Sequence, residues 1–125
     1  MEIEEVGRQI VDSSLKVHKE LGPGLLESAY QFCLTHELKK RNLLVETELD
    51  QPILYDGELL NVGYRLDMLV ENCVIIENKA VESLLPIHQA QLLTYLRLRN
   101  VHLGYLINWH VPLIKYGIKR MVHKL

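Results

Sequence analysis

The most informative stretch of the chain is Arg65–Lys79, which reads RLDMLVENCVIIENK. Its two halves are rich in apolar and β-branched residues, and Glu71 and Asn72 separate them as a pair typical of a tight turn. The sequence therefore predicts two antiparallel strands, one over Leu59–Val70 and a return strand over Cys73–Val81. Consecutive strands of this kind lie side by side in one sheet.

The polar residues of this stretch share one face of the predicted sheet. Because side chains alternate along a strand, Glu77 and Lys79 project from the same face. If the turn is centred on Asn72, Asp67 lies directly opposite Glu77, with the two Cβ atoms ~4.5–5.5 Å apart. Two carboxylates this close suit a divalent ion that prefers oxygen ligands, such as Mg²⁺. The alternative is a structural ion pair between Lys79 and one of the acids, and the pattern leaves both interpretations open.

The N-terminal part of the chain predicts two helices and a further strand. Apolar residues keep helical spacing over Ile3–Leu21, and Gly22–Gly24, with proline at its centre, ends that helix. A second helix is expected over Leu25–Arg41, which contains no helix breaker. Val45–Tyr55 reads as a strand, although Pro52 indicates an edge or a bulge.

The C-terminal part of the chain adds a helix and two strands. Pro86 opens a helix over Ile87–Arg99, Val101–Ile107 reads as a buried strand, and Ile118–His123 as a last strand. The element order is α-α-β-β-β-α-β-β, in a single domain over residues 1–125. This order predicts an α/β fold with a mixed central sheet flanked by helices.

Three further polar residues lie on predicted helix stripes. Glu27 shares a stripe with Tyr30 and follows the glycine-rich break, where it either completes an ion site or suits the helix dipole. Gln91 and Tyr95 are four residues apart on one helix face. They either find hydrogen bonds in the core or orient a phosphate or a base.

The charge distribution is uneven along the chain. The formal net charge is −2 and the pI is about 6.3, which excludes a strongly basic nucleic-acid binder. All 16 acidic residues precede Ser83, however, and every later charged side chain is basic. These basic residues either pack against the acidic N-terminal part or form a rim that faces phosphate groups. The candidates for the rim are Lys115, Lys119, Arg120 and Lys124, with Arg97 and Arg99 at a helix end.

Several classes of protein are not expected. The acidic start has no apolar stretch after it, and no segment reaches the ~20 apolar residues of a membrane helix. Cys33 and Cys73 have no zinc-site spacing and are expected to be free thiols in a reducing compartment. We therefore expect a cytoplasmic protein that does not associate with membranes.

Four short motifs occur along the chain in a specific order. They are G-x-x-E-x-x-Y at Gly24–Tyr30, G-Y-R-L-D at Gly63–Asp67, E-N-K at Glu77–Lys79 and Q-x-x-x-Y at Gln91–Tyr95. In this order and spacing the chain resembles the GxxExxY protein family of the PD-(D/E)XK nuclease superfamily, near the RecB-like exonuclease branch. The resemblance covers nearly the whole chain.

The resemblance implies a restriction-endonuclease-like core and a metal-dependent nuclease that acts on nucleic acid, most of all DNA, with RNA left open. It implies that Asp67 and Glu77 ligate Mg²⁺ or Mn²⁺ and that Lys79 positions or activates the attacking water. The other residues that it assigns to the site are Glu27 as a third acid, Gln91 and Tyr95.

The chain departs from the family pattern at two positions. Leu66 stands where many members have proline, and Asn78 stands where an apolar residue is expected, so a buried Asn78 amide needs polar partners. A second class of function is also open, a non-catalytic binding or assembly module that keeps the nuclease fold and acts with a partner. A core of this size is also compatible with a homodimer.

Overall fold

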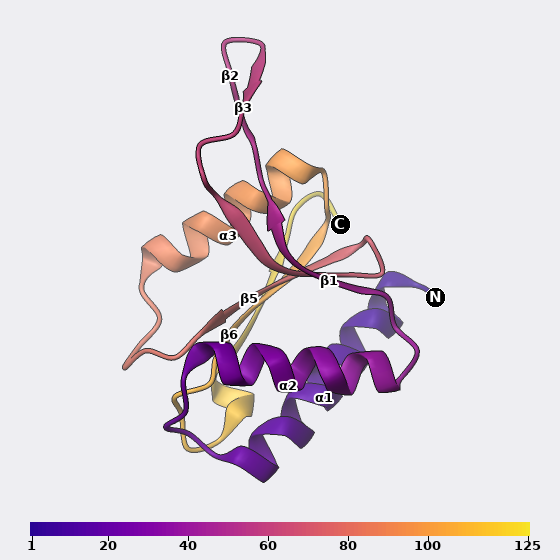
Figure 1. Ribbon diagram of the computed structural model, residues 1–125, viewed down its shortest axis with the longest axis vertical. Helices are drawn as coiled ribbons and strands as arrows, with labels where there is room; N and C mark the ends of the chain where they lie inside the picture. The colour runs from indigo at the N-terminus through magenta and orange to yellow at the C-terminus, as the bar shows by residue number, and fades with distance from the viewer.

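A five-stranded mixed sheet forms the centre of the molecule, as the sequence predicts (Figure 1). The computed structural model describes residues 1–125, and its central strands lie in the order β1-β4-β5-β6-β7. Neighbouring strands are antiparallel, except that β5 and β6 run parallel on either side of a helical crossover. The strands are β1 (Val45–Asp50), β4 (Arg65–Val70), β5 (Val74–Lys79), β6 (Leu103–Asn108) and β7 (Ile118–Val122).

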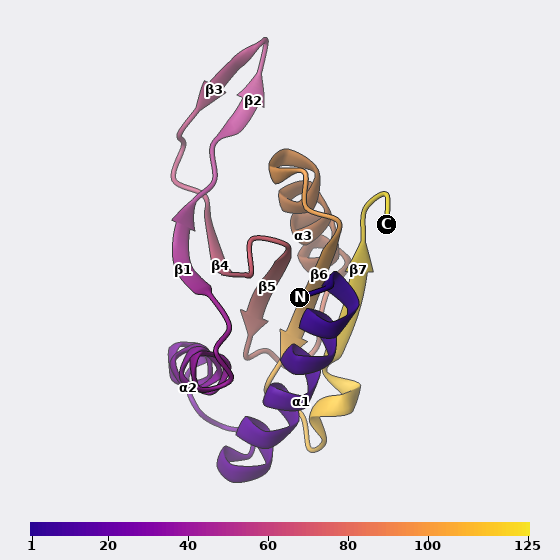
Figure 2. The same ribbon diagram turned by 90° about the vertical axis from the view of Figure 1, so that its right-hand side faces the viewer.

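Three helices cover the two faces of this sheet. Figure 2 shows β5 between α2 on one side and α3 on the other. Met68 and Ile76 pack in the larger core cluster with residues of α1 and α2, while Ile75 and Leu106 pack in a second cluster with α3. The helices are α1 (Ile3–Leu21), α2 (Glu27–Lys40) and α3 (Pro86–Arg99), and a short 3₁₀ helix η1 (Ile114–Tyr116) precedes β7.

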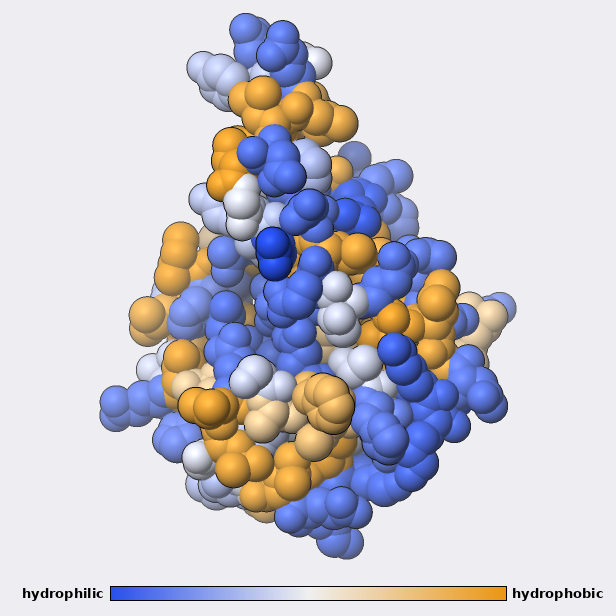
Figure 3. All heavy atoms as spheres, viewed as in Figure 1, coloured by the Kyte–Doolittle hydropathy of each residue, from blue (hydrophilic) through white to orange (hydrophobic).

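The prediction of one continuous strand over Val45–Tyr55 and another over Leu59–Val70 is wrong, because each segment forms two shorter strands. The distal parts form a separate hairpin of β2 (Ile53–Tyr55) and β3 (Glu58–Leu60), which projects from the sheet (Figure 1). Pro52 has no N–H for the ladder, and Gly63 takes a φ of 95°, so neither strand continues straight. The hairpin exposes Leu54, Tyr55 and Leu59, and hydrophobic atoms are visible along it in Figure 3.

The turn between β4 and β5 places the two acids as predicted. Glu71 and Asn72 have left-handed φ values of 51° and 55°, and Val70 pairs with Val74 across the turn. Met68 pairs with Ile76, so the register is centred on Asn72, and one step further Asp67 lies opposite Glu77. The predicted register, in which the turn is centred on Asn72, is confirmed.

None of the helices is both long enough and apolar enough to cross a membrane. Cys33 and Cys73 are both free thiols and both partly buried.

Candidate metal and active site

Backbone N–H groups of β4 and β5 orient the carboxylates of Asp67 and Glu77. The Asp67 N–H donates to Glu77 Oε2 at 2.8 Å, and the Asn78 N–H donates to Asp67 Oδ2 at 2.8 Å. Neither carboxylate makes a hydrogen bond or an ion pair with another side chain, so one oxygen of each has no protein partner. The pair is therefore oriented by the sheet itself, with one oxygen of each acid available to a ligand.

The environment of the pair disfavours two negative charges. Glu77 is only 4% exposed, and burial together with the charge of Asp67 raises the pKa of its carboxyl to about 8. Burial raises the pKa of Asp67 to about 6, with smaller contributions from Glu27 and Glu48, although the Asn78 hydrogen bond acts in the opposite direction. A bound cation would relieve this destabilisation of the charged forms.

Lys79 lies close to both acids but forms no ion pair with either. Its charge lowers the pKa of Asp67 and of Glu77, yet no carboxylate oxygen lies within 4.0 Å of its ammonium group. The alternative interpretation of Lys79 as a direct structural ion-pair partner is therefore not supported. Its amine is left available to a third group at the site.

The Asn78 amide is fully partnered, which accounts for a polar residue at this buried position. Its Oδ1 accepts a hydrogen bond from Trp109 Nε1 at 2.9 Å, and its Nδ2 donates to Gln31 Oε1 and to Met68 Sδ, both at 3.3 Å. The Trp109 ring, which is fully buried, stacks on Tyr30 with ring centroids 4.9 Å apart. Trp109 is thus a core aromatic that fixes the strand between Glu77 and Lys79.

The tyrosine of the G-x-x-E-x-x-Y motif extends this network to the start of α2. The Tyr30 hydroxyl donates to Gly22 O at 2.5 Å and accepts from the Leu25 N–H at 3.1 Å. It therefore closes the loop that leads to Glu27, while its ring packs on Trp109. The motif has a structural role that links α2 to the strand of Glu77.

Two residues beside the acid pair were missed by the sequence interpretation. In the β1–β4 register Glu48 falls opposite Asp67, and it adopts a φ of 53° within the strand. Gln31 bridges the two parts of the site, because its Nε2 donates to Glu48 Oε1 at 2.9 Å and its Oε1 accepts from Asn78. The one sequence signal for Gln31 is its spacing of four residues from Glu27, which puts both on one face of the helix. Glu48 has no such signal, because it lies among acids typical of a strand exposed to solvent.

Glu27 lies near Asp67, one of the two acids of the pair. Glu27, Glu48 and Asp67 line one open groove of about 740 Å³ between α2 and β1. No group of three or more His, Cys, Asp or Glu side chains is arranged to hold a metal ion. Because Glu27 shares a groove with Asp67, its role as a third ligand stays a prediction, and its place in the first turn of α2 also suits the helix dipole.

Gln91 and Tyr95 line a different groove from Glu27 and Asp67, and the convergence of all six residues in one cleft stays a prediction. Their groove lies between α3 and the residues at the base of the projecting hairpin, and Tyr64 forms part of it. Tyr95 is nevertheless close to the acids, because burial and the charge of Glu77 raise the pKa of its phenol to about 12. The acid pair thus lies between two grooves, with α2 beside one and α3 beside the other.

The basic residues of the C-terminal part do not form a single rim. Lys119 pairs with Leu106, which pairs with Glu77, so Lys119 lies on the face of Glu77 at two strand spacings, ~10 Å away. Arg120 points to the opposite face, where its Nη2 contacts Glu4 Oε1 at 2.7 Å. Arg120 therefore packs against the acidic N-terminal part, which was the alternative interpretation of the charge asymmetry.

The other basic candidates are also spread over the surface. Lys115 lies in η1 and lines a groove with residues of α1. Arg99 holds the base of the hairpin, because its side chain donates to Gln51 Oε1 at 2.9 Å and to Asp50 O at 3.0 Å. Lys119 is therefore the basic residue whose strand position lies on the face of the acid pair.

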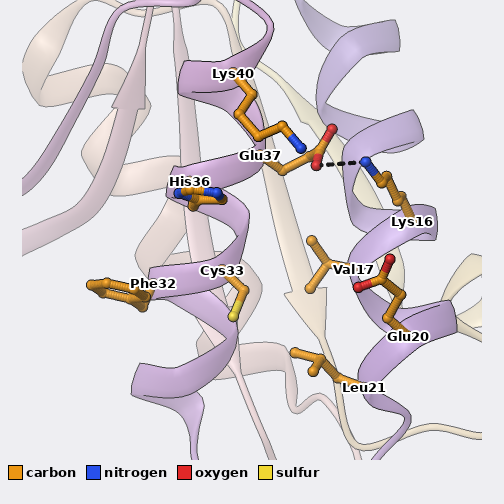
Figure 4. A pocket seen from close by; sticks show the side chains of 9 residues that line it. All are labelled: Lys16, Val17, Glu20, Leu21, Phe32, Cys33, His36, Glu37 and Lys40. Atoms are coloured by element: carbon orange, nitrogen blue, oxygen red, sulfur yellow. Dashed lines mark ion pairs between the residues drawn. The ribbon is translucent and has the colours of Figure 1, made fainter.

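A third hollow lies between α1 and α2 and contains none of the predicted site residues (Figure 4). Its side chains include Cys33 and the Lys16–Glu37 ion pair, which joins the two helices at 3.0 Å. Glu37 is also contacted by Arg41 at 3.0 Å. The hollow is part of the helix packing and is separate from the acid pair.

Comparison with known proteins agrees with this geometry. A model of the PD-(D/E)XK nuclease superfamily matches residues 4–121, which include both acids, Lys79 and all three helices except the start of α1. No curated protein and no solved structure matches the chain. The mixed sheet with helices on both faces is the restriction-endonuclease-like arrangement, and the chain belongs to the PD-(D/E)XK nuclease superfamily.

Proposed function

We propose that this protein is a divalent-metal-dependent nuclease that hydrolyses phosphodiester bonds, with DNA as its substrate. The observation that carries this proposal is the buried, mutually oriented pair of Asp67 and Glu77 beside an unpaired Lys79. Membership of the nuclease superfamily supports the reaction class. The G-x-x-E-x-x-Y motif supports a place in the GxxExxY family, near the RecB-like exonuclease branch.

The acid pair fits Mg²⁺ or Mn²⁺ by the chemistry of its donors. Asp67 and Glu77 offer carboxylate oxygens, the ligands that these ions prefer, in a site where negative charge is poorly solvated. A bound divalent ion would act as a Lewis acid, lowering the pKa of a water and offsetting charge on the phosphate. Glu27 and Glu48 line the adjoining groove and would accept hydrogen bonds from water around the site.

Lys79 supplies a cation and hydrogen-bond donors to the phosphate or to the attacking water. A protonated lysine has no lone pair, so it is not a metal ligand. Because no carboxylate holds its ammonium group, a phosphate oxygen can be contacted without breaking an ion pair first. Tyr95 and Gln91 border the acid pair from α3 and would orient the part of the substrate on that side.

A nuclease assay tests the proposed function directly. Single-stranded DNA, duplex DNA and RNA are incubated with the protein in Mg²⁺ or Mn²⁺, beside Glu77→Gln protein that still folds. Metal-dependent cleavage by the parent and none by Glu77→Gln is expected. Calorimetric titration of Mg²⁺ or Mn²⁺ gives the metal affinity independently of any substrate. Absence of cleavage of all three nucleic acids, with no metal binding, would contradict the proposal.

One observation favours a second candidate, a non-catalytic assembly module. The projecting β2–β3 hairpin exposes Leu54 at 61%, Tyr55 at 69% and Leu59 at 72%, which is unusual for an isolated surface hairpin. Such a surface could contact a partner protein or a second copy of this chain. If the nuclease assay is negative, replacement of Leu54 and Leu59 by serine, followed by measurement of the oligomeric state, becomes the informative experiment.

The metal-free protein is expected to lose stability as pH rises from about 5 to about 8. The pKa values of Asp67 and Glu77 are raised on folding, to about 6 and about 8, so the folded state binds more protons than the unfolded chain over this range. Stability therefore falls with increasing pH, and we expect the melting temperature to drop by more than about 5 °C. Saturating Mg²⁺ should cancel most of this loss at pH 8, and Glu77→Gln should flatten the profile. A melting temperature that rises from pH 5 to 8 without metal would contradict it.

Lys119 and Arg120 form a matched pair for testing the phosphate-facing surface. Lys119→Ala should weaken binding to DNA and reduce the salt dependence of the affinity, because one phosphate contact is lost. Arg120→Ala removes an equal charge from the opposite face of the sheet, where the Arg120 side chain is already paired with Glu4. This change should alter the affinity for DNA less than twofold. Fluorescence anisotropy at several salt concentrations measures both, and equal effects of the two changes would exclude a special role for Lys119.

A further inference from the structure

The groove beside α3 has a composition unlike that of the groove beside α2. It has a volume of about 480 Å³ and is lined by Ile53, Tyr64, Ile87, Gln91, Thr94 and Tyr95 among other residues. No Lys, Arg, Asp or Glu side chain lines it. Apart from His88, whose Nδ1 accepts a hydrogen bond from the Leu85 N–H, phosphate would find no cationic partner here, whereas a flat, uncharged group would find apolar walls and the rings of two tyrosines.

The two tyrosines of the groove form an ordered aromatic pair. The rings of Tyr64 and Tyr95 meet edge to face, with centroids 6.4 Å apart and planes at 62°. Tyr95 is only 4% exposed, while Tyr64 is 46% exposed. Tyr95 thus supports Tyr64, and the exposed part of the Tyr64 ring remains accessible to a ligand.

The walls of this groove are fixed relative to each other. The Gln51 N–H donates to the backbone carbonyl of Tyr64 at 2.8 Å, which holds the Tyr64 backbone against the end of β1. Arg99 donates from α3 to Gln51 Oε1 and to Asp50 O, so the helix and the end of β1 are tied together. The groove is therefore formed before any ligand arrives, which lowers the entropic cost of binding.

The groove is also next to the acid pair. Tyr64 precedes Asp67 by three residues on the same chain segment, and the charges of Glu77 and Asp67 both act on the Tyr95 phenol. A nucleotide whose phosphate lies at the acids therefore has its base within reach of the groove. The amide of Gln91 offers both a donor and an acceptor to the edge of such a base.

We propose that this groove takes an unpaired nucleobase adjacent to the scissile phosphate, with Tyr64 as the stacking platform. The inference rests on the proposed nuclease function and narrows its substrate to single-stranded nucleic acid or to unpaired ends. A base in a duplex is already stacked and paired, so it would have to leave the helix to enter the groove, which opposes binding. The protein therefore binds unpaired strands in preference to blunt duplex.

Binding of oligonucleotides with and without bases tests this proposal. Fluorescence anisotropy with a labelled oligothymidine is compared with the same backbone carrying consecutive abasic sites, using Lys79→Ala protein so that the strand stays intact. Stacking on an aromatic side chain is worth ~1–3 kcal/mol per base, so the abasic strand should bind ~10–100-fold more weakly. Blunt duplex of equal length should also bind more weakly than the oligothymidine.

A matched pair of tyrosines supplies the control. Tyr64→Ala should lose ~10–100-fold in affinity for the oligothymidine and nothing for the abasic strand, and Tyr64→Phe should keep most of the affinity. Tyr55→Ala removes a tyrosine that is 69% exposed on the projecting hairpin, outside the groove, and should leave both affinities unchanged. If Tyr64→Ala does not fold, the abasic comparison on protein with the native Tyr64 decides alone.

The failure of this inference can be told apart from failure of the proposed function. Equal affinity for oligothymidine, abasic strand and duplex overturns the groove proposal, even if the protein cleaves DNA. The groove proposal is also overturned if Tyr64→Ala and Tyr55→Ala change the affinity for oligothymidine equally. Base-dependent binding without cleavage in Mg²⁺ or Mn²⁺ supports the groove and overturns the nuclease.

Discussion

Lys79→Ala is expected to reduce phosphodiester cleavage by ~10²–10³-fold while leaving the fold and most of the metal affinity intact. One positioned group that contacts charge in the transition state typically contributes this much to the rate. Lys79 is well placed for such a contact, because it projects from the face of Glu77 and is held by no ion pair. Cleavage rates of parent and variant, measured with saturating Mg²⁺ or Mn²⁺, give the effect.

The comparison with Glu77→Gln separates catalysis from structure. That substitution removes a proposed ligand, so metal affinity and cleavage should both fall, and the pH dependence of stability should weaken. Lys79→Ala should lower only the cleavage rate. If Lys79→Ala lowers the free energy of unfolding and leaves the cleavage rate of the folded protein unchanged, the lysine has a structural role and not a catalytic one.

Trp109→Ala is expected to lower the free energy of unfolding by ~3–5 kcal/mol, the usual cost of removing a large buried aromatic side chain. The Trp109 ring is fully buried, stacks on Tyr30 and donates to Asn78 Oδ1. Its removal leaves both a cavity and a buried amide oxygen without its donor. Denaturant unfolding measures the change, and Tyr116→Ala, a change at an aromatic residue that is 76% exposed, serves as the control.

Trp109→Phe tests the link between this residue and the site. Phenylalanine keeps an aromatic ring against Tyr30 but cannot donate to Asn78, so a smaller loss of ~1–3 kcal/mol is expected. Because Asn78 lies between Glu77 and Lys79, metal affinity should fall as well. Unchanged metal affinity in a destabilised Trp109→Phe protein would show that the site does not depend on this hydrogen bond.

The relative position of Asp67 and Glu77 could be predicted from the sequence, because the alternation of side chains along a strand and the tight turn between the two strands determine it. Asn72 centres the register, and the placement of Asp67 opposite Glu77 follows without any knowledge of tertiary packing. Glu48 was missed, because its position depends on which strand lies on the far side of Asp67 and on a left-handed backbone within β1. Pairings between distant segments are not visible in local periodicity.

The errors have a common physical origin in tertiary context. Pro52 was recognised as an interruption, but whether it bends a strand or ends it depends on the neighbouring strand. Helical spacing places Gln91 and Tyr95 on one face of α3 but does not show that they line a different groove from Glu27. Arg120 and Lys119 are adjacent in sequence, yet the alternation of β7 sends them to opposite faces.

The turn at Glu71 and Asn72 also sets the order in which the site assembles as the chain folds. A hairpin forms in ~1–10 μs, so Asp67 and Glu77 meet as soon as β4 and β5 pair. Tyr95 and Lys119 reach them only after longer loops have closed, which has a higher entropic cost. The two acids thus come together while still hydrated, and they lose their water last, when the helices pack. A cation that binds the completed site is therefore expected to slow unfolding and to leave the folding rate nearly unchanged.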